Sequence, residues 1–293
     1  MAHGLVHRSQ EVPVRGGFKG CVDRLGRSEA RDQPQLVVFP GAGGEPAQYM
    51  NLIVAFVTLG YEVIFITLPG DQLGLDGQWL LTDYGDAVVQ TIDWSRPYYC
   101  FAWSQGALGL MEFLARRDLR AKPVAAVANN VCLPGTLDMA AYCRLARVVP
   151  MPKWVLALNR VLVGILAAVW PSFKIPRALY LAPWPKLFGA DWRQRVTPSV
   201  KWISVKSLAS MLFAKVDATA ITTPLRVLEP LHDVCNYGKQ AEILERQGLK
   251  TGQMYSLFGG HDLPFGEEGA REVSCQAHFF FDLCNKLPAI QRS

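Results

Sequence analysis

The sequence of 293 residues lacks any run of Lys and Arg that would mark a nucleic-acid-binding stripe. It holds 30 basic and 25 acidic residues, an excess that we interpret as small and spread along the chain. No basic stripe with interleaved aromatic residues is present, so recognition of DNA or RNA is disfavoured. The weak positive charge leaves acidic ligands and membrane surfaces open as partners.

The seven cysteines include no pair at the Cys-x-x-Cys spacing of a zinc or redox site. Scattered small thiols in odd number are typical of a protein in a reducing compartment. The beginning of the sequence mixes charges with glycines and lacks the apolar segment of a secretory signal. We therefore expect a cytoplasmic protein with no metal and no cofactor.

No hydrophobic run reaches the roughly 20 residues that a membrane-spanning helix needs. The strongest candidate, Trp154–Trp170, is shorter and carries Asn159 and Arg160 near its middle, where charge disfavours insertion. We expect this segment to form a buried helix or one that seeks an interface. Peripheral membrane contact through this part of the chain stays open, as does the oligomeric state.

Half of the residues are hydrophobic, which is enough for a sizeable core. Short apolar runs that predict strands alternate with segments of helical spacing. The predicted strands are Gln35–Pro40, Tyr61–Leu68, Pro97–Trp103, Pro123–Asn130, Thr222–Glu229 and Gly252–Phe258. The predicted helices are Ala47–Leu59, Leu80–Ile92, Gln105–Arg117, Tyr237–Gln247 and Glu267–Leu287. This alternation predicts an α/β fold whose mostly parallel sheet is covered by helices on both faces.

The alternation is absent from two parts of the chain. Residues 1–34 predict an N-terminal extension or an edge hairpin. Residues 133–216 are rich in Trp, Leu and Pro and predict a helical insertion that stands over the sheet as a lid or cap. The core then comprises residues 35–132 and 217–293. We expect the apolar residues of the insertion either to line an acyl pocket or to pack the insertion against the sheet.

Ser104 lies at the junction of a predicted strand and a predicted helix, in the sequence Ala102-Trp103-Ser104-Gln105-Gly106. A tight turn between such elements presents the serine Oγ above the edge of the sheet and requires small residues two positions before and after it. Ala102 and Gly106 meet that requirement. Ser104 is therefore a candidate nucleophile, and the alternative is a serine that only caps the helix.

A nucleophilic serine needs a base, and the chain has five histidines. His3 and His7 lie in the N-terminal extension, and His278 lies within the last predicted helix. His261 lies in a glycine loop directly after the last predicted strand. A loop at the carboxyl edge of a parallel sheet can reach a serine at the end of a neighbouring strand. We predict His261 as the base, with His232 as a less well-placed candidate.

The histidine in turn needs a carboxylate to fix its tautomer. Asp233 follows the predicted strand Thr222–Glu229, and His261 follows the next predicted strand, Gly252–Phe258. The chain order is then Ser, Asp, His, the order found in serine hydrolases with a strand–turn–helix nucleophile. Alternatives are Glu229, Asp262 and Asp138. One oxyanion donor is predicted to be the backbone N–H of Gln105, and the second is expected from the glycine-rich loop Pro40–Gly44 after the first predicted strand. That loop lacks the Gly-Lys-Ser/Thr that follows a phosphate-binding loop.

The motifs FPGAGG, YEVIFITLPG, AWSQGALG, LHD and FGGHD together resemble the type II thioesterases of polyketide and nonribosomal peptide synthesis, within the α/β-hydrolases. Ala102 stands where that family usually carries Gly. The resemblance implies an α/β-hydrolase fold with Ser104 as nucleophile, His261 as base, Asp233 as acid, and Ala42 and Gln105 as oxyanion donors. It also implies carrier-bound or small-molecule acyl substrates.

Three functions follow from these residues. The first is hydrolysis of an ester or thioester of a lipophilic acyl group through an acyl-enzyme. The second is acyl transfer by the same residues, with an alcohol or amine in place of water. The third is a non-catalytic binding protein on the same fold.

Overall fold

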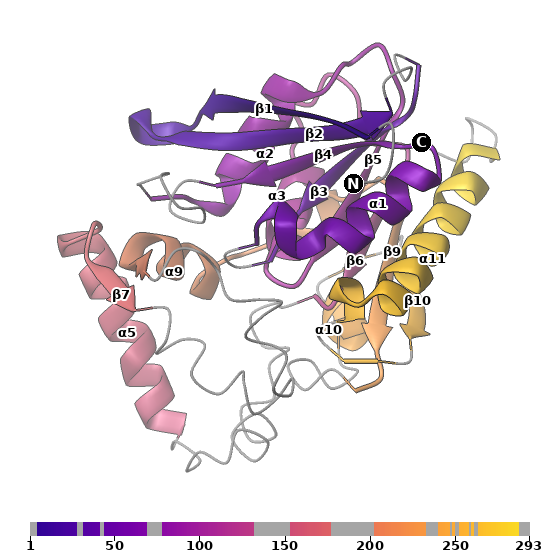
Figure 1. Cartoon of the computed structure of the whole chain (residues 1–293). Coiled ribbons are helices and arrows are strands. Elements are labelled where there is room, and N and C mark those ends of the chain that lie inside the picture. Colours follow the sequence, from indigo (N-terminus) through magenta and orange to yellow (C-terminus); the bar gives the residue numbers. More distant parts are fainter. Residues whose placement is uncertain are drawn as a thin grey trace.

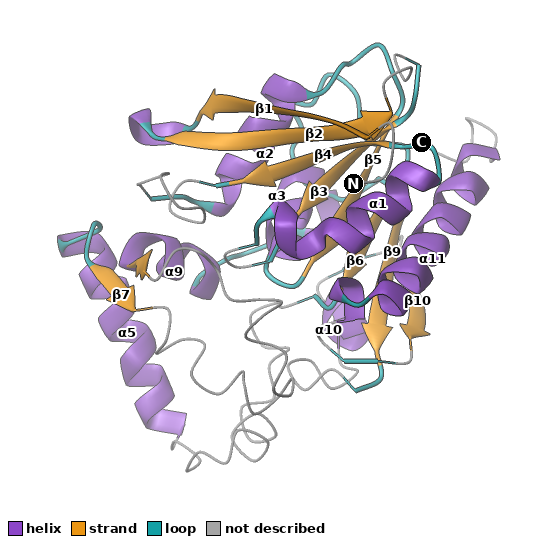
Figure 2. Ribbon diagram, viewed as in Figure 1, coloured by secondary structure: helices purple, strands orange, loops and turns teal. Residues whose placement is uncertain are grey.

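The fold is described from a computed structural model of the chain. The described residues are 5–27, 32–41, 44–68, 78–131, 153–176, 202–232, 240–246, 248–249, 252–257, 259–260 and 263–286. Within them, an eight-stranded sheet forms the centre of the molecule and helices cover both of its faces (Figures 1 and 2). The predicted α/β architecture is therefore confirmed.

The central sheet has the strand order β1-β2-β4-β3-β5-β6-β9-β10. In chain order its strands are β1 (Leu5–Pro13), β2 (Lys19–Arg27), β3 (Gln35–Phe39), β4 (Glu62–Thr67), β5 (Tyr98–Trp103), β6 (Ala126–Asn129), β9 (Leu225–Pro230) and β10 (Gly252–Leu257). The six strands from β4 to β10 pair in parallel. Each of these six overlaps a strand that the sequence predicts.

An antiparallel hairpin of β1 and β2 extends the sheet at one edge, where β2 pairs antiparallel with β4. Val12 and Val22 of the hairpin are buried in the same core as β4. The hairpin thus belongs to the central sheet. The boundaries predicted for the segments of the chain stay a prediction.

Two hydrophobic cores lie on the two faces of the sheet, because successive residues of a strand point to opposite sides. Val37 and Phe39 of β3 belong to one core, whereas Leu36 and Val38 belong to the other. The flanking helices are α1 (Met50–Thr58), α2 (Leu81–Thr91), α3 (Gly106–Leu114), α10 (Gln240–Arg246) and α11 (Glu267–Lys286). Helices α2 and α3 pack on the first core, and α1 and α11 on the second.

The predicted insertion contributes no strand to the central sheet within its described residues. It contains α5 (Lys153–Val169), β7 (Lys174–Pro176), β8 (Trp202–Ser204) and α9 (Val205–Leu212), of which β7 and β8 form a separate two-stranded sheet. Helix α9 is held to the core by hydrogen bonds from the Trp79 and Leu81 amides to Ser207 and Ser210. Among the described helices, none is long and apolar enough to cross a membrane.

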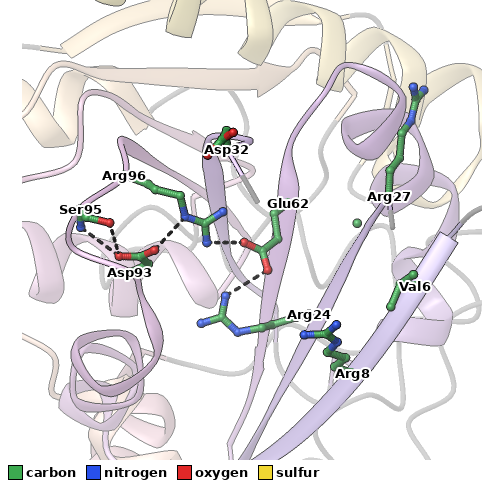
Figure 3. A pocket seen from close by; sticks show the side chains of 10 residues that line it. Val6, Arg8, Arg24, Arg27, Asp32, Glu62, Asp93, Ser95 and Arg96 are labelled. Atoms are coloured by element: carbon green, nitrogen blue, oxygen red, sulfur yellow. Dashed lines mark hydrogen bonds and ion pairs between the residues drawn. The ribbon is translucent and has the colours of Figure 1, made fainter. Parts of the chain in front are cut away.

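A pocket of about 660 Å³ lies at the amino ends of β3, β4 and β5, and charged side chains line it. Figure 3 shows the network in its wall, in which Arg24 and Arg96 both donate to the Glu62 carboxylate, at 3.2 Å and 2.6 Å. Arg96 also pairs with Asp93 at 3.1 Å. Glu62 is thus the shared acceptor of two half-buried cations, which ties β2, β4 and the turn before β5 together.

Glu62→Ala should lower the free energy of unfolding by about 2 kcal/mol, because it leaves two half-buried guanidinium groups without their shared carboxylate. Urea denaturation followed by circular dichroism measures the change. The matched control is Glu11→Ala, which breaks the exposed pair with Lys19 and should leave the denaturation midpoint unchanged. Equal effects of the two variants would contradict the role given to Glu62.

Candidate active site

Ser104 occupies the turn between β5 and α3 with a backbone φ of 54°. This left-handed conformation is uncommon for a residue with a side chain and costs of the order of 1–3 kcal/mol, so it persists only where the surrounding structure enforces it. The residue is only 4% exposed. A strained serine at a strand–helix turn is the geometry that the sequence predicts for an activated nucleophile.

Gly106 explains how the turn is enforced. A Cβ at this position would lie 2.1 Å from the Phe39 carbonyl oxygen and 2.4 Å from that of Pro40, both on the neighbouring strand and its loop. Only glycine lets α3 begin this close to the end of β3. Ala102, two residues before the serine, is fully buried within β5 and its methyl group is accommodated in the first core.

The amide of Gln105 is one of the first-turn N–H groups of α3, which have no partner within the helix. Together with the helix dipole, such groups favour negative charge beside the serine. The Gln105 side chain is buried, and its amide atoms have no hydrogen-bond partner among the described residues. The backbone N–H of Gln105, the predicted oxyanion donor, thus lies directly after Ser104 at the start of α3.

Two tyrosines hold the loop that follows β3. The Gly41 amide donates to the Tyr49 hydroxyl at 2.9 Å, and the Tyr84 hydroxyl donates to the Pro40 carbonyl at 3.3 Å. The loop is closed by a turn in which the Gly44 amide donates to the Gly41 carbonyl. Ala42, the predicted second oxyanion donor, lies outside the described residues. Gly41 and Gly44, the described residues on either side of it, are held by these hydrogen bonds.

Backbone hydrogen bonds continue across the carboxyl edge of the sheet from the serine outward. The Ser104 amide donates to the Asn129 carbonyl on β6 at 2.9 Å, and the Asn130 amide donates to the Leu228 carbonyl on β9 at 3.2 Å. Beyond β9, the His232 amide donates to the Gly259 carbonyl after β10 at 2.9 Å. The loops after β5, β6, β9 and β10 therefore share one edge, with β9 about 10 Å from β5.

Asp233 and His261, the predicted acid and base, lie outside the described residues, as do the alternatives Asp138 and Asp262. Their described neighbours are His232 and Gly260, on the two loops joined by the bond between His232 and Gly259. Glu229, another alternative acid, is 7% exposed in β9.

The other described histidines have structural partners away from this edge. His7 bonds to the Asp23 carboxylate at 2.7 Å within the N-terminal hairpin. His278 of α11 contacts the Tyr61 hydroxyl at 2.9 Å. Neither arrangement brings a histidine to Ser104. Among the described residues, no group of His, Cys, Asp or Glu side chains is arranged to hold a metal ion.

Three aromatic rings connect the loops of the site. Trp103 precedes Ser104, Tyr49 holds Gly41, and Phe265 follows the His261 loop in the short helix Leu263–Phe265. The ring centroids of Trp103 and Phe265 are 4.7 Å apart, those of Tyr49 and Phe265 5.0 Å, and those of Tyr49 and Trp103 5.7 Å, all edge to face. Such pairs are favourable beyond the area they bury. They fix the loops around the serine relative to one another.

The sequence interpretation missed several residues of the site. Tyr49, Tyr84 and Phe265 resemble ordinary core aromatics in the sequence. Asn129 is fully buried at the end of β6, and its side-chain amide has no partner among the described residues. Asn130 follows with a φ of 53°. The pair of asparagines that ends the predicted strand Pro123–Asn130 is a signal for this edge.

Comparison with known proteins supports the fold. No family model and no curated protein sequence matches the chain. Solved structures do. A monoglyceride lipase from Saccharomyces cerevisiae is 12% identical with a TM-score of 0.71, the alignment covering 94% of each chain. A monoacylglycerol lipase from Paleococcus ferrophilus is 18% identical with a TM-score of 0.65, covering 96% of this chain and 99% of that one.

The thioesterase domain from the curacin biosynthetic pathway is 12% identical with a TM-score of 0.60, covering 95% of this chain and 99% of that one. These structures share the α/β-hydrolase fold, with its mostly parallel sheet between helices. The chain described here therefore has the α/β-hydrolase fold, as the sequence predicts. At these identities the likeness defines the fold alone.

Gly106→Ala should destabilise the protein severely, because the added methyl group has to displace two backbone carbonyls rather than a flexible side chain. The expected loss is about 3 kcal/mol or more, measured by thermal and urea denaturation. Gly266→Ala is the control, since a methyl group there meets nothing within 4 Å. Equal stability of the two variants would show that α3 does not begin where the structure places it.

Proposed function

We propose that the protein is a serine hydrolase that cleaves an ester or thioester of a lipophilic acyl group through an acyl-enzyme. The observation that carries this proposal is the left-handed backbone of Ser104 beside the first-turn amides of α3. A serine used only as a helix cap needs an extended backbone and no such strain. The two lipases and the thioesterase domain with the same fold support hydrolysis as the reaction class.

In this mechanism the Ser104 Oγ attacks the carbonyl carbon of the substrate while His261 accepts the hydroxyl proton. The carbonyl oxygen becomes an oxyanion, which accepts hydrogen bonds from the Gln105 and Ala42 amides. When the tetrahedral intermediate collapses, the bond to the leaving alcohol or thiol breaks, and His261 donates the proton to the leaving group. Ser104 is then esterified by the acyl group.

The second half of the reaction repeats these steps with water. His261 takes a proton from the water molecule as it attacks the acyl-enzyme, and returns the proton to Ser104 as the acid departs. Asp233 holds the imidazole in the tautomer that can accept the serine proton and stabilises the imidazolium that forms. The hydrogen bond between the loops after β9 and β10 supports this assignment over Asp138, which lies at the start of the insertion.

The proposed substrate is lipophilic because the insertion of residues 133–216 is rich in Trp and Leu. Its described helices and strands stand outside the central sheet, which supports a lid above the site (Figure 2). A dry site under such a lid would also suit transfer of the acyl group to an alcohol or amine. The cytoplasmic location inferred from the cysteines is part of the same proposal.

Ser104→Ala should abolish hydrolysis of p-nitrophenyl esters, by a factor of about 10⁴ or more, because no other group can form the acyl-enzyme. A fluorophosphonate probe should label the wild type and not the variant. Ser95→Ala, an exposed serine at the opposite edge of the sheet, is the matched control and should keep both activity and labelling. Labelling of Ser104→Ala at the wild-type rate would refute the assignment, and no labelling of the wild type would favour a binding protein.

Asp233→Asn should lower kcat by roughly 10⁴, because an amide in place of the carboxylate favours the wrong histidine tautomer, as it does in the catalytic triads of serine proteases. The comparison variants are Asp138→Asn and Glu229→Gln, with circular dichroism to confirm folding. A mild effect of Asp233→Asn together with a severe effect of Asp138→Asn would place the acid after β6 instead.

A further inference from the structure

Helix α5 exposes a stripe of large apolar side chains. Trp154, Leu158, Val161, Leu162, Ile165 and Val169 are between 45% and 79% exposed. At 100° per residue these six positions fall within an arc of about 100°, so they share one face of the helix. We call this face the α5 stripe. Contiguous exposed apolar patches of this kind mark surfaces that bind something.

The opposite face of α5 already has its partners. Val163 lies about 150° from the centre of the stripe and packs against the core on the first face of the sheet. Arg160 lies over the Phe213 ring, with its guanidinium carbon 5.0 Å from the ring centroid, and Gly164 faces the same ring. The helix is therefore anchored by α9 and the core, and the exposed side chains of the α5 stripe face the solvent.

The described part of the insertion carries charge of one sign. The described parts of the insertion, residues 153–176 and 202–216, carry five basic residues and no acidic one. Over residues 133–216 the sequence has twelve Lys or Arg and two Asp, whereas the rest of the chain has 18 basic and 23 acidic residues. The interpretation that the positive charge is spread along the chain is therefore wrong, since it is concentrated in the insertion.

We propose that the α5 stripe docks this protein onto the surface of a bilayer that contains anionic phospholipids. An exposed apolar helix face on a segment with an excess of basic charge is the pattern of a helix that lies in the plane of the interface. The phosphates of an anionic bilayer complement the basic residues, whereas an apolar protein partner would not require them. Figure 1 places α5 at the periphery of the molecule, on the side away from α11.

Exposed tryptophans stand at the two ends of α5, which supports a helix that lies in the plane of the interface. Trp154 is 68% exposed near the start of α5, and Trp170 is 57% exposed directly after its end. Tryptophan favours the level of the lipid headgroups because its ring is apolar and its N–H is polar. With about 25 Å between the ends of the helix, both tryptophans can reach the headgroup level together when α5 lies parallel to the surface.

Vesicle binding by the full-length protein tests the stripe. We expect the wild type to co-sediment with vesicles of phosphatidylcholine and phosphatidylglycerol, and Ile165→Asp to bind at least about tenfold more weakly because a charge replaces an apolar side chain at the centre of the stripe. Phe279→Asp is the matched control, since this side chain is 62% exposed on α11. Equal loss in both variants, or none in Ile165→Asp, would overturn the proposal.

A second set of variants tests whether binding to vesicles needs the basic residues of the insertion. Lys206→Glu with Lys215→Glu, on and just after the helix that contacts α5, should weaken binding by about fivefold or more per residue and make it less sensitive to salt. Lys19→Glu with Lys122→Glu changes the net charge equally at sites outside the insertion and should bind as the wild type does. Equal binding of the wild type to pure phosphatidylcholine vesicles would contradict the choice of an anionic surface.

A second copy of the chain is the competing occupant of the stripe. Light scattering would then show a dimer that Ile165→Asp converts to a monomer, with no binding to vesicles, and this result would overturn the proposal. The test does not depend on catalysis, because Ser104→Ala should bind vesicles as the wild type does. Loss of hydrolysis and loss of docking are thus separate outcomes.

Discussion

The close approach of helix α3 to the end of strand β3 is the constraint on which the candidate site depends. The backbone carbonyls of Phe39 and Pro40 occupy the space that any side chain at Gly106 would need. Because the helix begins there, only Ser104 and Gln105 connect β5 to α3, and Ser104 makes the turn with a positive φ. The same approach places the Gln105 amide at the helix N-terminus beside the serine.

That local strain is held by packing further away. Val37 and Phe39 on one face of β3, and Leu36 and Val38 on the other, anchor the strand in both cores. Strand β5 is buried along its whole length between β3 and β6. A cost of a few kcal/mol at one residue is small against the burial of two such cores, so the turn is stable although it is unfavourable by itself.

The parts of the fold that the sequence could predict are those set by local pattern. The run Tyr61–Leu68 is apolar and β-branched, and it contains β4. The segment Leu80–Ile92 has apolar residues at helical spacing, and it contains α2. The order of strands depends on crossovers between distant segments and has no local signal. The two-stranded sheet of β7 and β8 depends on pairing across an insertion broken by prolines. The tyrosines that hold the loop at Gly41 act through long-range contacts that a single sequence does not reveal.

The net charge of the whole chain conceals the charge of the insertion. A net charge of +5 is unremarkable for 293 residues, yet it is the sum of a basic insertion and an acidic remainder. Likewise, an apolar helix such as α5 has the same composition whether its stripe faces the core or the solvent. The direction in which the stripe faces is set by two contacts on the other side of α5. Val163 packs against the core, and Arg160 lies over the ring of Phe213 at the end of α9. Successive residues of a helix are 100° apart, so anchoring one side of α5 turns the apolar stripe toward the solvent. There a ligand or a surface outside the described fold can cover it.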